Sequence, residues 1–148
     1  MCSQITAHLQ AKDMGLEDVP GAKTAVGEPQ APIDNQTFTG MKFLVMTPHC
    51  HAPSCLRQEM WNNDTGELLC RSIGKYGTGI EVFNEVNYLA IPPCIWGEQG
   101  GLHLPPTTHP DTNLTAIKYF NNTFRHMGQM AQWTGLMVYE GVPGGNPY

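Results

Sequence analysis

Two histidines near the middle of the chain have the spacing that best supports chemistry. His49 and His51 flank Cys50 within residues 47–55. If this segment is a strand, alternate side chains point to the same face, so the two imidazoles lie side by side and Cys50 points the opposite way. Two imidazoles on one strand face can hold a single metal ion, and imidazole suits both copper and zinc.

A third ligand for such an ion has to come from elsewhere in the chain, and residues 125–130 offer two. Met130 supplies a thioether, which favours Cu(I) because sulfur is a soft ligand that Zn(II) seldom takes. His126 lies four residues before Met130 and is the alternative for the same position. The sequence therefore predicts a copper site formed by His49, His51 and Met130, with His126 as the alternative third ligand.

This arrangement resembles a known family. A His-x-His motif early in a β domain, with a Met entering the last strand, resembles the C-terminal domain of the copper type II, ascorbate-dependent monooxygenases. That family includes peptidylglycine α-hydroxylating monooxygenase and dopamine β-hydroxylase. Its substrate-side copper is held by two His and one Met, so the resemblance implies that role for His49, His51 and Met130. The similarity spans residues 43–140 and includes the short segments 119–123, 128–130 and 136–139.

The chain also departs from that family. Gln129 stands where the family usually has a Glu. The family's N-terminal domain, which holds a second copper through three His, has no counterpart, and residues 1–40 cannot supply it. Because both coppers are needed to deliver two electrons to O₂, the resemblance implies copper binding alone, or work with a partner that brings the second site. Enzymatic activity, the substrate and any catalytic residues stay open.

Five cysteines suggest a disulfide framework. Cys50 or Cys55 could pair with Cys94 or Cys70, and four cysteines allow three pairings among which the sequence does not choose. Cys2, close to the N-terminus, is the natural candidate for the remaining free thiol.

Two other sites could use the same residues. A zinc site of His49, His51, Cys55 and Cys94 is possible, although its spacing matches no zinc-finger pattern. A nucleophilic pair of Cys55 or Cys94 with His126 is the second alternative, although nothing marks either thiol as activated.

Four N-x-Thr sequons indicate N-linked glycosylation, at Asn35, Asn63, Asn113 and Asn121. Four sequons, five cysteines and a charged fraction of 14% favour an oxidising, extracellular setting. The N-terminus shows no basic segment followed by an apolar one, so no signal peptide is visible. The expectation is therefore a secreted glycoprotein in a mature or truncated form.

Short strands are the elements that would position these residues. The chain has 148 residues, with 16 Gly and 12 Pro, which indicates one domain with many turns. Turns recur every 8–12 residues between residues 41 and 140, as is typical of a β-sandwich or jelly roll. We expect an all-β, antiparallel fold of about eight strands. The expected strands are residues 42–46, 56–61, 67–72, 81–83, 88–91, 114–120 and 131–140.

Residues 1–40 differ from this pattern because they carry little apolar periodicity and are interrupted by Pro20, Pro29 and Pro32. We expect an extended arm or disordered tail with one helical turn near residues 5–12, followed by the sandwich and a C-terminal tail over residues 141–148. An extended arm can add a strand to a neighbouring sandwich. The alternative function is therefore a structural glycoprotein subunit that assembles into oligomers or filaments through its arm, without catalysis.

Charge and hydropathy argue against other partners. The net charge is −5 and the eight basic residues are scattered, whereas nucleic-acid binding needs a basic stripe. The sequence contains no run of 18 apolar residues of the kind that spans a membrane as a helix. A row of exposed aromatic residues, as in a carbohydrate-binding module, is not apparent. The expected partner is a second copy of the chain.

Overall fold

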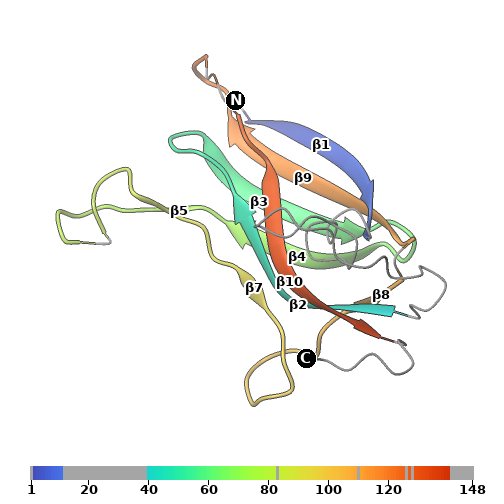
Figure 1. The fold of residues 1–148 in the computed structure, drawn as a ribbon. Helices are drawn as coiled ribbons and strands as arrows, with labels where there is room; N and C mark the ends of the chain where they lie inside the picture. Colours follow the sequence, from blue (N-terminus) through green and yellow to red (C-terminus); the bar gives the residue numbers. More distant parts are fainter. Residues whose placement is uncertain are drawn as a thin grey trace, which may run out of the picture.

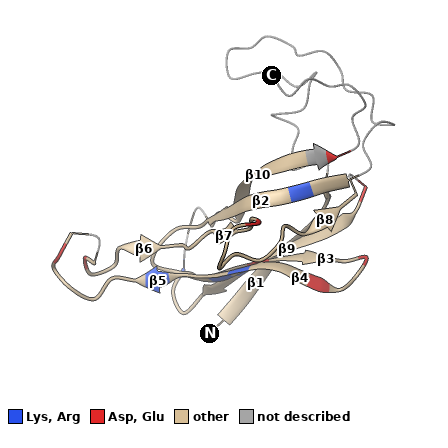
Figure 2. Ribbon diagram, turned by 90° about the horizontal axis from the view of Figure 1, so that it is seen from below, with Lys and Arg blue, Asp and Glu red and all other residues tan. Residues whose placement is uncertain are grey.

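The computed structural model describes residues 2–11, 40–82, 84–109, 111–125, 127 and 129–140. These residues form antiparallel sheets, and the two larger sheets lie face to face as two layers (Figures 1 and 2). The expected all-β, antiparallel fold is confirmed. The described part contains ten strands, and four of them are only two residues long.

The first sheet has the order β1–β9–β3–β4. Its strands are β1 (Cys2–Gln10), β9 (Asn113–Asn121), β3 (Cys55–Asn62) and β4 (Glu67–Ile73). The expected strands at 56–61, 67–72 and 114–120 lie inside β3, β4 and β9. Local hydrogen bonds shape the turn that joins β3 to β4. The Asn62 side chain accepts backbone hydrogen bonds from Asp64 and Thr65, and Gly66 has a φ of 73°.

The second sheet has the order β10–β2–β7, and β8 pairs with the start of β2. Its strands are β10 (Gln132–Glu140), β2 (Gly40–His49), β7 (Cys94–Ile95) and β8 (Thr107–Thr108). β5 (Lys75–Tyr76) and β6 (Leu89–Ala90) form a separate two-stranded ribbon (Figure 2).

A β-bulge in β2 decides which of its side chains face the core. Leu136 pairs with Val45 but Met137 pairs with Phe43, so Leu44 is an extra residue in β2. Odd-numbered residues are buried before the bulge and even-numbered residues after it, namely Met41, Phe43, Met46 and Pro48. The bulge therefore leaves His49 on the outer side of the second sheet.

The core lies between the two larger sheets. Met41, Phe43 and Met46 of β2 face Met60 of β3 and Leu114 of β9, and all five side chains are fully buried. Trp133 and Met137 of β10 pack against this cluster. Each sheet therefore buries one face against the other, as a sandwich requires.

Two disulfides reinforce the sandwich. Cys70 of β4 is bonded to Cys94 of β7, so this bond joins the two layers, and Cys50 is bonded to Cys55 across the β2–β3 connection. All four candidate cysteines are therefore paired, although neither Cys50 nor Cys55 pairs with Cys70 or Cys94. Cys2 is free and exposed, as expected.

A buried carboxylate lies on the outer side of the first sheet. Glu59 of β3 is 2% exposed and accepts hydrogen bonds from Trp61 Nε1 at 3.1 Å and Arg71 Nε at 2.8 Å. Arg57 Nε lies 3.2 Å from the same carboxylate. Burial alone would raise the pKa of Glu59, but these hydrogen bonds and the two guanidinium charges outweigh it and hold the pKa below its usual value.

Two expectations about local structure are wrong. Residues 2–10 form strand β1 of the sandwich's own first sheet, where an arm with a helical turn was expected. Residues 81 and 82 form a bend and a turn where a strand over 81–83 was expected, because the backbone N–H of Gly79 donates to the carbonyl of Asn84 and closes a loop. Of the expected strand 88–91, only Leu89 and Ala90 are in a strand, β6. The remainder of the expected arm, 12–39, and the expected tail, 141–148, lie outside the described residues.

Candidate functional site

The predicted histidine pair lies where β2 ends. The ring centroids of His49 and His51 are 5.0 Å apart, and the ring planes are almost perpendicular at 88°. Both side chains are exposed, whereas Cys50 between them is buried. The structure thus gives the alternation that the sequence predicted, with two imidazoles together and the cysteine turned away.

A disulfide and a backbone hydrogen bond hold the segment that carries this pair. The Cys50–Cys55 disulfide spans the β2–β3 connection with a Cα–Cα distance of 6.0 Å, and the Ala52–Pro53 peptide bond in it is cis. Ser54 is buried, and its carbonyl accepts the backbone N–H of Asn121 at 2.8 Å. The connection is therefore held to the first sheet on its buried side while the imidazoles remain accessible.

Met130 lies at the same end of the second sheet. Gln132 of β10 pairs with His49, and Met130 precedes Gln132 by two residues. Its side chain is partly exposed. The alternative ligand, His126, lies outside the described residues. The register therefore brings Met130 to the end of the sheet that carries the histidine pair.

A buried lysine fastens the segment that leads into β10. Lys118 of β9 is fully buried, and its Nζ donates to the Met130 carbonyl at 2.6 Å and to Gln129 Oε1 at 2.7 Å. Gln129 Nε2 donates to Ser54 Oγ at 2.8 Å, which links this segment to the β2–β3 connection. Burial lowers the pKa of Lys118 because it removes the ammonium group from water. One lysine thus positions the backbone of Met130.

The sequence reasoning missed this lysine, although a signal was present. The inward positions of β9 are Leu114, Ala116, Lys118 and Phe120, so Lys118 interrupts an apolar alternation. Gln58 pairs with Lys118 in the ladder, and neither its Oε1 nor its Nε2 has a partner among the described residues. Two polar side chains, Gln58 and Lys118, are therefore buried side by side on the inward face of the first sheet.

The cysteine-based alternatives do not fit this structure. Both Cys55 and Cys94 are disulfide-bonded, so neither offers the thiolate that a zinc site with His49 and His51, or a nucleophilic pair with His126, would need. Within the described residues, no three His, Cys, Asp or Glu side chains are grouped to hold a metal ion. Two imidazoles therefore require a thioether, or a ligand from the undescribed residues, to complete a site.

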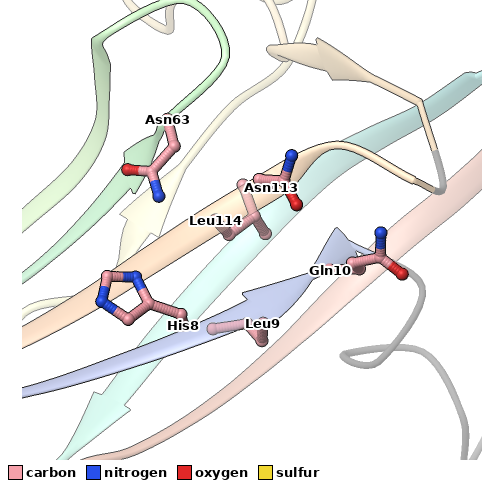
Figure 3. Close-up of a pocket in the computed structure, with 6 residues that line it drawn as sticks. All are labelled: His8, Leu9, Gln10, Asn63, Asn113 and Leu114. Atoms are coloured by element: carbon pink, nitrogen blue, oxygen red, sulfur yellow. The ribbon is translucent and has the colours of Figure 1, made fainter.

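A shallow pocket of about 430 Å³ lies at the opposite end of the first sheet (Figure 3). His8 Nδ1 is hydrogen-bonded to Thr115 Oγ1 at 2.9 Å, and Asn113 donates to Asp64 from its backbone and its side chain. The pocket is lined by amide, imidazole and aliphatic groups, namely His8, Leu9, Gln10, Asn63, Asn113 and Leu114.

Three of the four predicted glycosylation sites are on the described surface. Asn63 lies in the β3–β4 turn, and Asn113 and Asn121 are the first and last residues of β9. All three are exposed, and the Asn121 side chain accepts hydrogen bonds from Thr123. Asn35 lies outside the described residues. The folded chain therefore leaves these three asparagines accessible at the ends of strands.

Comparison with known proteins gives no relative for this chain. No helix in the described ranges has the length and apolar character needed to cross a membrane. No protein-family model matches the sequence, and neither does any curated protein or any solved structure.

Proposed function

We propose that this protein binds one copper ion through His49 and His51, with Met130 as the third ligand. The observation that carries the proposal is the exposed histidine pair, whose ring centroids are 5.0 Å apart. Side chains this close can turn their lone pairs to one ion without unfolding the strand. The exposure of both rings leaves a path by which the ion can enter.

The ligand types favour copper. Imidazole binds copper and zinc alike, but a thioether adds affinity mainly for Cu(I). The cysteine sulfurs near the site are held in disulfides, which removes the thiolates typical of structural zinc sites. A His₂Met set would stabilise the reduced ion and so suit a redox role, and oxygen chemistry would require a partner that supplies a second copper.

The proposed setting is extracellular. Two disulfides are compatible with an oxidising compartment. Exposed Asn63, Asn113 and Asn121 are acceptors for N-linked glycans. Intact-mass measurement of protein from its native source should give a mass above that of the bare polypeptide, and the bare mass would contradict this setting.

Copper titration tests the site itself. Wild-type protein should bind one equivalent of copper, whether it is supplied as Cu(I) or as Cu(II), in competition with a chromophoric chelator. The double variant His49→Ala/His51→Ala should lose both, whereas Met130→Leu should weaken Cu(I) at least tenfold and leave Cu(II) nearly unchanged. His103→Ala, which removes an exposed imidazole elsewhere, is the matched control. Equal, weak binding by the wild type and the double variant would refute the proposal.

A further inference from the structure

Within the described part of the chain, the first strand is attached to the sandwich through a single neighbouring strand. β1 pairs with β9 over nine residues, from Cys2 opposite Asn121 to Gln10 opposite Asn113. Among the described strands, β9 is its only ladder partner. β1 therefore sits at the edge of the first sheet, where it can leave without breaking any other described ladder (Figure 1).

The surface that β1 covers is specific for it. Leu9 packs against the core and Ala11 is fully buried, with its N–H donating to the Thr112 carbonyl at 2.9 Å. Near the other end, Asn122 Nδ2 donates to Ser3 Oγ at 2.5 Å. If β1 left the sandwich, the edge of β9 and the apolar surface beside it would be exposed. Another copy of β1 would fit this edge because it offers the same contacts.

The connection from β1 to the rest of the chain permits the strand to reach another molecule. Residues 12–39 separate Ala11 from Gly40, and a segment of that length can span up to about 90 Å. β1 also contains no Asp, Glu, Lys or Arg, so no like charge opposes its approach to a second copy.

We propose that two copies of this chain exchange their first strands, so that β1 of each docks on β9 of the other. The exchanged and closed forms make the same β1–β9 contacts, so their balance depends on the connection and on protein concentration. Reciprocal exchange closes a two-fold dimer without any new interface. This proposal is independent of copper binding.

The native free thiol allows a direct test. Cys2 and Asn121 face each other in the ladder, and the Asn121 N–H is directed away from β1, to the carbonyl of Ser54, the residue that precedes β3. Cys2 and Asn121 therefore form a non-hydrogen-bonded pair, whose short Cα separation suits a disulfide. In the Asn121→Cys variant, an oxidant should form a disulfide between Cys2 and the new cysteine at position 121. The bond lies within one chain if β1 is docked on its own β9, and joins two chains if β1 is docked on the β9 of another molecule.

Full-length Asn121→Cys is prepared in light and isotopically heavy forms, mixed, incubated over a hundredfold range of concentration and oxidised. We expect covalent dimers whose 2–121 linkage joins a heavy to a light chain, in a fraction that grows roughly in proportion to concentration while monomer predominates. Cys2→Ser/Asn121→Cys should give none. Linkage only within single chains at every concentration would overturn the proposal. Covalent species larger than dimers would show that the exchange is not reciprocal between two chains.

A second variant protects the test against a local failure at the strand end. Cys2→Ser/His8→Cys/Thr115→Cys places the thiols at a pair whose native side chains are in hydrogen-bond contact. The same heavy–light dimers are expected. If neither variant forms interchain links, the exchange does not occur.

Discussion

At the residue scale, Glu59 shows how a carboxylate can be buried and still stay ionised. Three cationic or polar side chains converge on it, from Trp61, Arg57 and Arg71. Their combined effect is a pKa below the usual value. The charge of Glu59 therefore stabilises the fold only while the carboxyl group is deprotonated.

Glu59→Gln keeps the size of the side chain but removes this charge. Because the folded pKa is below the unfolded one, the contribution of Glu59 is complete above about pH 4.5 and is lost as the pH falls through the folded pKa. We expect a loss of about 1–3 kcal/mol in unfolding free energy at pH 7. The difference from wild type should shrink below pH 4.

Urea unfolding at pH 7 and pH 3 measures this effect. Glu67→Gln, at an exposed position on the neighbouring strand, should change the stability little at either pH. A loss for Glu59→Gln that is the same at both pH values would show that packing, and not charge, is responsible.

At the element scale, the pairing of β10 with β2 places both proposed ligand segments at one end of the second sheet. Gly135 of β10 allows the close approach, because a Cβ atom there would lie 2.6 Å from the Val45 carbonyl oxygen. Gly135→Ala forces this backbone apart. It should lower the unfolding free energy by about 1–3 kcal/mol.

The control for that substitution is Gly100→Ala, where an added Cβ meets no atom within 4 Å. It should leave the denaturant midpoint almost unchanged. Equal midpoints for Gly135→Ala and Gly100→Ala would contradict the pairing of β10 with β2 at this position.

The bond between Cys70 and Cys94 links elements of different layers that are 24 residues apart in sequence. Closing a loop of that size in the unfolded chain is worth about 3 kcal/mol. Cys70→Ala/Cys94→Ala should therefore lose roughly that much in non-reducing denaturant, while Cys2→Ser should lose nothing. Similar losses for both would show that cysteine replacement itself is damaging.

The strands that could be predicted from the sequence are those with a clear local pattern of alternating apolar and polar residues. β2, β3, β4, β9 and β10 follow from alternation and from turn residues such as Asn62 and Gly66. β1 was missed although Ile5, Ala7 and Leu9 alternate with polar residues, because the run is short and a proline-containing segment follows it. The bulge at Leu44 and the choice among three disulfide pairings depend on contacts between distant segments, which no local pattern contains.

At the scale of the whole molecule, bound copper should stabilise the fold because Met130 reaches the histidine pair only when β10 is paired with β2 in the folded chain. Free copper at about 100 times its dissociation constant should add about 2.7 kcal/mol to the unfolding free energy. The gain should become smaller as the solution is made more acidic, because protons compete with the metal for the imidazole lone pairs.

Thermal unfolding with and without copper, at pH 7.5 and pH 5.5, tests this. His49→Ala/His51→Ala should show no copper-dependent rise in melting temperature at either pH. A rise of the same size in that variant would place the copper elsewhere on the protein.

The extra residue in β2 also governs which genetic changes this protein can tolerate. Deletion of one codon at Leu44 would remove the extra residue and join Phe43 directly to Val45 in a regular strand, so Met46 and Pro48 would stay inward and His49 outward. Deletion of the codon for Thr47, beyond the bulge, would instead turn Pro48 outward and His49 inward, although it changes neither imidazole. In a collection of variants, loss of Leu44 should therefore leave the proposed metal uptake nearly intact, whereas loss of Thr47 should abolish it as completely as substitution of both histidines.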